Sequence, residues 1–193
     1  MKRVFFLITA IFFFTACSMP ETKIYSLSLP AERKLANNKS DSSVNLRVSS
    51  PRYLSQQYIA YRTSPYQIDI SKYSKWESSP VEMIRDAFKD SFYSRGISKD
   101  VKTSKFVPSG YYSVDIQLRR FERTGSDNDQ FGEIDFEAVV SSPEGKEIYR
   151  KTVSRRIRLE NKDNLNLAKS LSLALSEGVE EAITGIAAVM NNI

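Results

Sequence analysis

The N-terminal 17 residues restrict what the rest of this chain can become. Lys2 and Arg3 form a short positive start, and residues 4–14 are an apolar run of 11 residues. A helix that spans a bilayer needs about 20 apolar residues, so this run is typical of a cleaved signal peptide. It is followed closely by Cys17, the only cysteine among 193 residues. The exported part of the chain is therefore expected to fold without an internal disulfide.

The small residues Thr15 and Ala16 directly before Cys17 resemble the lipobox of bacterial lipoproteins, with Phe14 where Leu is usual. This resemblance implies cleavage after Ala16 and attachment of diacylglycerol to the Cys17 thiol. It also makes Ser18 the sorting residue, because Asp at that position favours retention in the inner membrane of enteric-type bacteria and Ser does not. An ordinary buried thiol or a disulfide partner is the alternative for Cys17, but its place at the edge of a removable segment argues against both.

Length and composition limit the mature chain to one domain with few residues suited to catalysis. Removal of residues 1–16 leaves 193 − 16 = 177 residues, with residues 17–23 as lipidated cysteine and tether and residues 24–193 as a single periplasmic domain. Loss of Lys2 and Arg3 lowers the formal charge from +5 to +3, too little to indicate nucleic-acid binding. Histidine is absent, which excludes Ser-His and Cys-His catalysis and the usual zinc sites. We expect no catalytic residue, no metal and no cofactor.

Alternation of apolar and polar residues predicts strands in the first half of the domain. Asn45 and Arg47 are expected on the solvent face of the second strand. The last two strands are joined by a Ser-Pro turn and predict a hairpin, and the polar residues 31–43 predict a solvated loop. The predicted strands are residues 24–29, 44–50, 58–63 and 67–70.

Two amphipathic helices and three further strands are predicted in the second half. Ser79, Pro80 and Glu82 have the spacing of a helix start with a capping box, and Gly96 is the expected stop. A second, long helix over residues 163–190 contains Gly178 and Gly185, whose expected use is close approach to the sheet. The strands between the helices are residues 112–119, 133–140 and 146–159. The predicted fold class is α+β, an antiparallel sheet with two helices packed on one face.

Three groups of polar residues are candidates for function. The acidic residues near the turn at position 127 could bind a cation, although a polar turn is the simpler interpretation. The arginines are expected to pair with the acidic residues of the neighbouring strand, with a phosphate or lipid headgroup as the alternative ligand. The acidic set is Asp127, Asp129 and Glu133; the arginines are Arg119, Arg120, Arg123, Arg155, Arg156 and Arg158, facing Glu133, Asp135 and Glu137.

The third group is a set of tyrosines and one arginine around the predicted hairpin, Tyr53, Tyr58, Tyr61, Arg62 and Tyr66. Tyr and Arg are enriched in the cores of protein interfaces, so this set predicts a binding surface, with cross-strand packing as the alternative. Successive side chains of a strand alternate faces. We therefore expect Tyr61 to pack toward the helices and Arg62 to project outward, toward a partner protein or a second copy of the chain.

Several short motifs in this order resemble the ABC-type transport auxiliary lipoproteins, the family that includes paraquat-inducible protein C. They are the lipobox cysteine, Lys23-Ile24-Tyr25-Ser26-Leu27, Arg52-Tyr53-Leu54, Tyr61-Arg62-Thr63 with Tyr66, Trp76 and Pro80 before a helix, and the C-terminal Ala/Leu-rich helix. The resemblance implies a non-catalytic protein, lipid-anchored in the outer membrane and facing the periplasm. It also implies work with an MCE-domain protein and an inner-membrane transporter in lipid transport, which maintains the envelope.

An envelope lipoprotein that activates or scaffolds another periplasmic protein, such as a cell-wall enzyme, is the alternative function. Such a protein typically needs a long disordered tether to cross the peptidoglycan layer. The six residues 18–23 span roughly 20 Å when extended, which is too short for that purpose.

Overall fold

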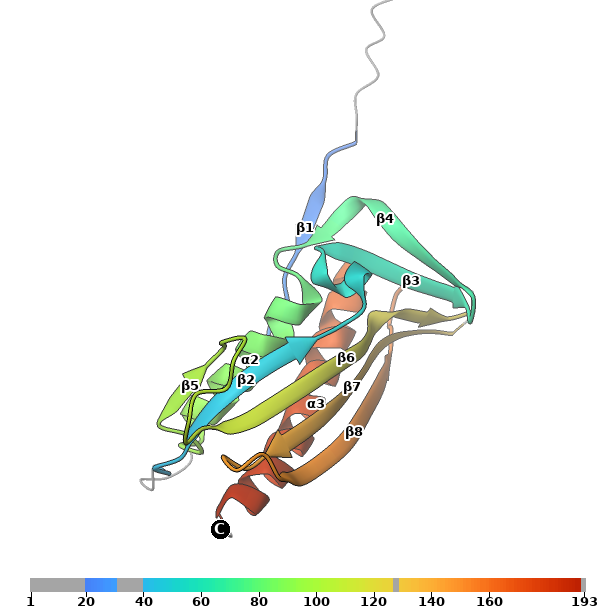
Figure 1. Ribbon diagram of the computed structural model, residues 1–193. Helices are drawn as coiled ribbons and strands as arrows, with labels where there is room; N and C mark the ends of the chain where they lie inside the picture. Colours follow the sequence, from blue (N-terminus) through green and yellow to red (C-terminus); the bar gives the residue numbers. More distant parts are fainter. Residues whose placement is uncertain (1–19, 31–39, 127–128, 192–193) are drawn as a thin grey trace, which may run out of the picture.

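The computed structural model describes residues 20–30, 40–126 and 129–191 of the chain (Figure 1). The predicted lipidation and sorting residues, Cys17 and Ser18, lie outside these ranges, as do Asp127 and most of the predicted loop 31–43. In chain order the elements are β1 (Lys23–Tyr25), β2 (Ser43–Ser49), the 3-10 helix η2 (Arg52–Ser55), β3 (Tyr58–Ser64), β4 (Gln67–Trp76), α2 (Pro80–Ser94), β5 (Asp100–Lys102), β6 (Tyr112–Gly125), β7 (Gln130–Ser141), β8 (Glu147–Arg158) and α3 (Asn164–Asn191).

The long strand β6 is the centre of the sheet. One of its edges pairs antiparallel with β7, which in turn pairs antiparallel with β8. Its other edge is shared, because β2 pairs with residues 112–117 and β3 pairs with residues 123–124. The sheet continues from β2 to β5 and from β3 through β4 to β1 (Figure 1). The predicted β3–β4 hairpin and the predicted β6–β7–β8 meander are both confirmed.

The sheet is mixed rather than antiparallel throughout. β2 pairs parallel with both β5 and β6, and β3 with β6 and β1 with β4 are parallel as well. Helix α2 lies between β2 and β6 in the sequence, and a crossover of this kind returns the chain in the same direction. The fold class, α+β with a mostly antiparallel sheet and two helices packed against it, is as predicted.

Several strand ends differ from the predicted ones. The first strand stops at Tyr25 instead of residue 29, because the following residues run across the helices, where the Ser28 N–H donates to Ser172 Oγ at 3.1 Å. β4 extends to Trp76, well beyond the predicted end at residue 70. The three-residue strand β5 has no counterpart among the predicted elements.

Helix α2 begins with the predicted capping box. The Glu82 N–H donates to Ser79 Oγ at 3.3 Å, and the Ser79 N–H donates to the Glu82 carboxylate at 2.9 Å. This backbone hydrogen bond lowers the pKa of Glu82 below its ordinary value. Gly96 follows the helix with φ of 64°, a left-handed conformation that ends the helix at the expected residue.

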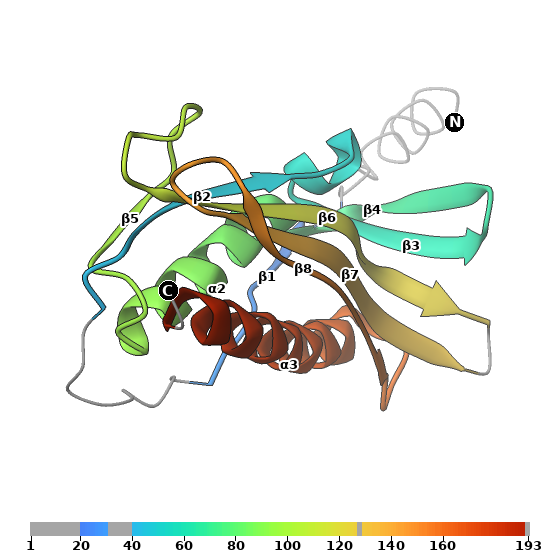
Figure 2. The same cartoon turned by 60° about the horizontal axis from the view of Figure 1, so that its bottom comes forward.

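Both helices cover the same face of the sheet (Figure 2). Phe136 of β7 is fully buried and meets Phe88 of α2 edge to face, with ring centroids 5.6 Å apart. It also lies against α3, where a Cβ on Gly178 would be 3.2 Å from the Phe136 ring. The predicted use of Gly178, close approach of helix and sheet, is therefore confirmed. In the described part of the chain, no helix combines the length and the apolarity needed to cross a membrane.

Candidate partner-binding surface

The β3–β4 hairpin carries the residues that the sequence singled out for binding. Tyr61 is the cross-strand neighbour of Arg123 of β6, and Arg62 is the neighbour of Thr124. Neighbouring residues of a strand point to opposite faces of the sheet. The hairpin thus places Tyr61 on the helix face and Arg62 on the outer face, as expected.

Tyr61 packs toward the helices, and this expectation is confirmed. Its hydroxyl donates to Asn164 Oδ1 at 2.9 Å, at the first residue of α3. The guanidinium of Arg123 lies over its ring, with 4.0 Å from the guanidinium carbon to the ring centroid. Tyr61 therefore joins the hairpin to the start of α3 and to β6 in one place.

Arg62 faces outward, but its guanidinium group is already occupied. Nε donates to Glu122 Oε1 at 2.5 Å and Nη2 donates to Oε2 at 3.2 Å, a bidentate pair. The Glu122 side chain is fully buried, and that of Arg62 is 21 % exposed. The expectation that Arg62 offers its planar fork to a partner is wrong in this respect, because a buried carboxylate of β6 takes both donors.

The third member of this cluster is Tyr53 of η2. Its hydroxyl donates to Glu122 Oε2 at 2.9 Å, so the carboxylate accepts hydrogen bonds from two separate elements. Burial, reinforced by the charge of Glu122, raises the pKa of Tyr53 to about 12. Tyr53 is therefore a neutral donor at physiological pH. The cluster of Tyr53, Arg62 and Glu122 fastens η2 and the hairpin to β6.

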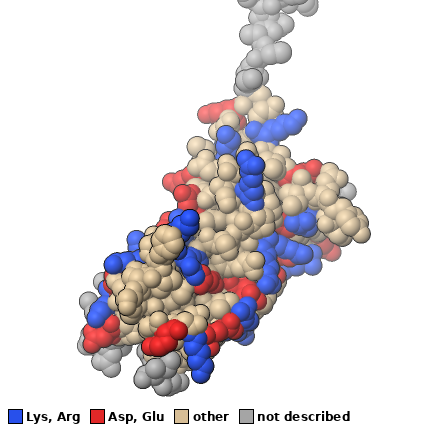
Figure 3. All heavy atoms as spheres, viewed as in Figure 1, with Lys and Arg blue, Asp and Glu red and all other residues tan. Residues whose placement is uncertain are grey.

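The outer face of the sheet is covered by further ion pairs. Arg119 pairs with Glu137 at 3.3 Å and Arg120 with Glu133 at 2.5 Å, as predicted from the alternation of charges. In Figure 3, which views this face, positive and negative groups lie next to one another. Such balanced pairing does not indicate a site for phosphate.

The arginines of β8 do not follow the prediction. Arg155 lies on the helix face and pairs with Glu181 and Glu177 of α3. Arg156 stacks on the Phe131 ring at 3.9 Å. The register of β8, uncertain from its sequence because charged residues occur on both faces, directs Lys151 and Arg155 toward α3.

The candidate cation site is not formed by the described residues. Asp129 pairs with Arg158 at 2.5 Å. Glu133 pairs with Arg120 and also accepts from the Thr124 hydroxyl at 2.9 Å. Within residues 20–30, 40–126 and 129–191, no group of three or more acidic side chains could hold a metal ion. The simpler interpretation, a polar turn with paired charges, fits this geometry.

Two small hollows adjoin each other between α2 and α3, beside the segment that follows β1. Their volumes are about 240 and 170 Å³. Both are lined by Leu29, Ala87 and Leu175, together with the acidic residue Asp90. This mixture of apolar and acidic walls does not indicate one class of ligand.

Among the polar residues exposed on the hairpin there are also exposed apolar and aromatic side chains. Tyr66 at the turn is 98 % exposed, and Tyr58 and Ile70 are each about two-fifths exposed. Ile70 was missed by the sequence analysis because residues 67–70 read as a short strand without an assigned face. Along the outer edge of β4, β1 pairs only with residues 74–76. The hairpin is thus a rigid, exposed arm that suits binding to another protein.

The model of a known protein family matches residues 25–183 of the chain, and its description is ABC-type transport auxiliary lipoprotein component. No curated protein sequence matches the chain. Protein XCC0632 from Xanthomonas campestris has a similar crystal structure, with 17 % identity, a TM-score of 0.75 and coverage of 88 % of this chain and 97 % of that one.

Two other solved structures resemble the chain. An uncharacterized protein has 17 % identity and a TM-score of 0.67, with coverage of 86 % of this chain and 99 % of that one. The PelC dodecamer from Paraburkholderia phytofirmans has 12 % identity and a TM-score of 0.47, with coverage of 83 % and 93 %. The family match extends over most of the sequence, from β1 into α3. The chain belongs to the family of ABC-type transport auxiliary lipoprotein components.

Proposed function

We propose that this protein is a non-catalytic, lipid-anchored subunit of a lipid transport system of the MCE and ABC type, in the role of paraquat-inducible protein C. Its place is the outer membrane, facing the periplasm, and its work maintains the envelope. The observation that supports this most is the family match, which begins at residue 25, only eight positions after Cys17. A domain this close to a lipidated cysteine is held at the membrane surface.

The partners in this proposal are an MCE-domain protein and inner-membrane transporter components, and a second copy of the chain is a further candidate. The exposed arm of the β3–β4 hairpin suits binding of this kind. Tyr61 and Arg62 contribute by holding the arm in place rather than by direct contact, because both are engaged within the domain. Cross-linking of intact cells followed by purification of the lipoprotein tests the partnership. Failure to recover the cell's MCE-domain protein with the wild type would refute the lipid-transport assignment.

The proposed anchor predicts that Cys17→Ala abolishes stable membrane association. One acyl chain gives only marginal binding, whereas three chains, at about 0.8 kcal/mol for each buried CH₂, make release negligible. Fractionation should show an uncleaved precursor of the variant that takes up no labelled palmitate. Normal maturation and labelling of Cys17→Ala would contradict the lipidation of this residue.

The proposed location predicts a role for Ser18. In an enteric-type host the wild type should be found in the outer-membrane fraction, and Ser18→Asp should shift it toward the inner membrane. The measurement is sedimentation of membranes in a density gradient, with Ser18→Thr as the matched control that adds no charge. Identical profiles for wild type and Ser18→Asp would remove Ser18 as the sorting residue.

A further inference from the structure

The loop between β5 and β6, residues 103–111, exposes an aromatic side chain. Phe106 is 79 % exposed and its neighbour Val107 is 37 % exposed. In Figure 1 this loop lies beside β5, at the opposite end of the domain from β1. Phe is enriched in the cores of protein interfaces, so this exposed ring is a candidate anchor for a binding partner.

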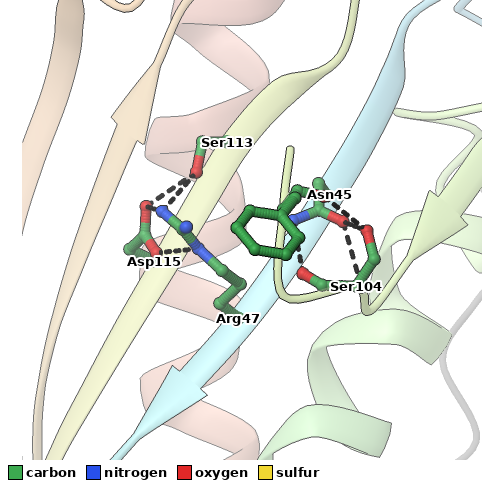
Figure 4. A network of polar contacts seen from close by, with 6 residues as sticks. Asn45, Arg47, Ser104, Ser113 and Asp115 are labelled. Atoms are coloured by element: carbon green, nitrogen blue, oxygen red, sulfur yellow. Dashed lines mark hydrogen bonds and ion pairs between the residues drawn. The ribbon is translucent and has the colours of Figure 1, made fainter. Parts of the chain in front are cut away.

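The loop is held from below by a buried asparagine. Asn45 of β2 is fully buried, and its Nδ2 donates to the Ser104 carbonyl at 3.1 Å. The Ser104 N–H donates back to Asn45 Oδ1 at 3.1 Å, and Ser104 Oγ lies 2.7 Å from the same oxygen (Figure 4). A buried amide needs such partners to offset its desolvation. Asn45 lies on the outer face of the sheet, as its sequence pattern predicted, but it is buried because the loop packs over it.

The rest of the loop is also fixed. Ser104 Oγ lies 2.7 Å from the Phe106 carbonyl, directly at the exposed residue. The Tyr111 N–H donates to the Pro108 carbonyl at 3.2 Å, across a turn in which Gly110 has φ of 80°. The Tyr111 hydroxyl donates to Asp100 of β5 at 2.6 Å. Phe106 is therefore presented by a preorganised loop, which reduces the entropy lost on binding.

The strand beneath the loop is braced as well. Arg47, two residues beyond Asn45 on the same face of β2, makes a bidentate pair with Asp115, at 2.6 and 2.8 Å (Figure 4). Its Nη2 also donates to Ser113 at 3.1 Å. Side-chain contacts therefore join β2 to β6 in addition to the backbone hydrogen bonds between the two strands.

The charge around Phe106 indicates what kind of surface it fits. Lys105 has its ammonium group 5.8 Å from the centre of the Phe106 ring, and Lys102 has its own 4.9 Å from that of Tyr111. The carboxylate of Asp100, which accepts from the Tyr111 hydroxyl, lies close enough to Lys102 to offset its charge, so the positive charge beside Phe106 is that of Lys105. An aromatic side chain with a lysine beside it is complementary to an apolar pocket with an acidic residue on its rim.

We propose that the Phe106 loop is the membrane-distal docking element for the periplasmic transport partner, the MCE-domain protein, and that Phe106 inserts into an acidic-rimmed apolar pocket of that partner. The inference rests on the proposed function, because the anchor at Cys17 is what turns this end of the domain away from its own membrane. Residues 18–23 span roughly 20 Å at most, so the tether holds the opposite end of the domain near the lipid.

Binding of the purified lipoprotein to the purified MCE-domain protein of the same cell tests the inference. Phe106→Ala should weaken this binding at least about tenfold, as expected for a hot-spot residue, and Phe106→Trp should retain it. Lys105→Glu should weaken binding and reduce its dependence on salt. Leu173→Ala, at an α3 residue that is 47 % exposed, is the matched control and should bind like the wild type. All four variants should melt like the wild type.

The outcomes separate the inference from the proposed function. Equal binding of wild type and Phe106→Ala overturns the docking role of the loop and leaves the partnership intact. Absence of binding by the wild type overturns both. If Phe106→Ala changes only self-association in analytical ultracentrifugation, the loop is a contact between copies of the chain and the inference is wrong.

Discussion

Replacing Arg62 by alanine is expected to lower the free energy of unfolding by about 3–5 kcal/mol. The change leaves the carboxylate of Glu122 buried, with only the Tyr53 hydroxyl as a remaining side-chain partner among those described. An uncompensated buried charge is costly because its hydration is not restored in the folded state. Urea denaturation at neutral pH measures the loss.

Arg47→Ala provides a matched control for this prediction. Arg47 also makes a bidentate pair with a carboxylate, but the side chains of Arg47 and Asp115 are 42 % and 38 % exposed. Water can replace the lost partner there, so the expected cost is at most about 1 kcal/mol. If Arg62→Ala costs no more than Arg47→Ala, burial of Glu122 does not make its pair important for stability.

Replacing Phe136 by alanine should lower the free energy of unfolding by about 3–5 kcal/mol as well. This fully buried ring touches α2 through Phe88 and α3 through the surface at Gly178. Gly178 has no side chain with which to fill the space, so the cavity would remain largely open. Thermal or urea unfolding followed by circular dichroism measures the effect.

Two variants set the scale for Phe136→Ala. Phe136→Leu keeps most of the apolar volume and should cost clearly less. Leu173→Ala removes a half-exposed side chain from α3 and should change stability little. A cost for Phe136→Ala below about 1 kcal/mol would mean that both helices close onto the sheet without this ring.

Local signals in the sequence were sufficient for much of this fold. The capping box of Ser79 and Glu82 acts over three residues, and the β3–β4 hairpin is specified by a Ser-Pro turn between two short runs. The β6–β7–β8 meander follows from alternation and two polar turns. These features depend on near neighbours, so one sequence is enough to predict them.

Features that depend on distant residues were not predictable in the same way. Continued alternation on β6 would place Glu122 on the helix face with Leu118, but a bulge between Leu118 and Arg120 moves it to the outer face. There Tyr53 and Arg62 cover its carboxylate. Asn45 is buried for a similar reason, since the loop that covers it lies about 60 residues further along. The sequence pattern of a strand cannot show that a segment far away in the chain buries one of its outward-facing residues.

The parallel pairing of β2 with β6 also affects the order in which the domain folds. Arg47 and Asp115, paired across these strands, are 68 residues apart in the sequence. Contacts of such long range slow folding, because the intervening chain must be ordered before they form. The segment from β6 to α3 has short connections and can fold early, whereas β2 precedes its partner strand by many residues and cannot pair until β6 is in place. The N-terminal half is therefore the part of a newly exported chain that stays open longest to proteases and to chaperones.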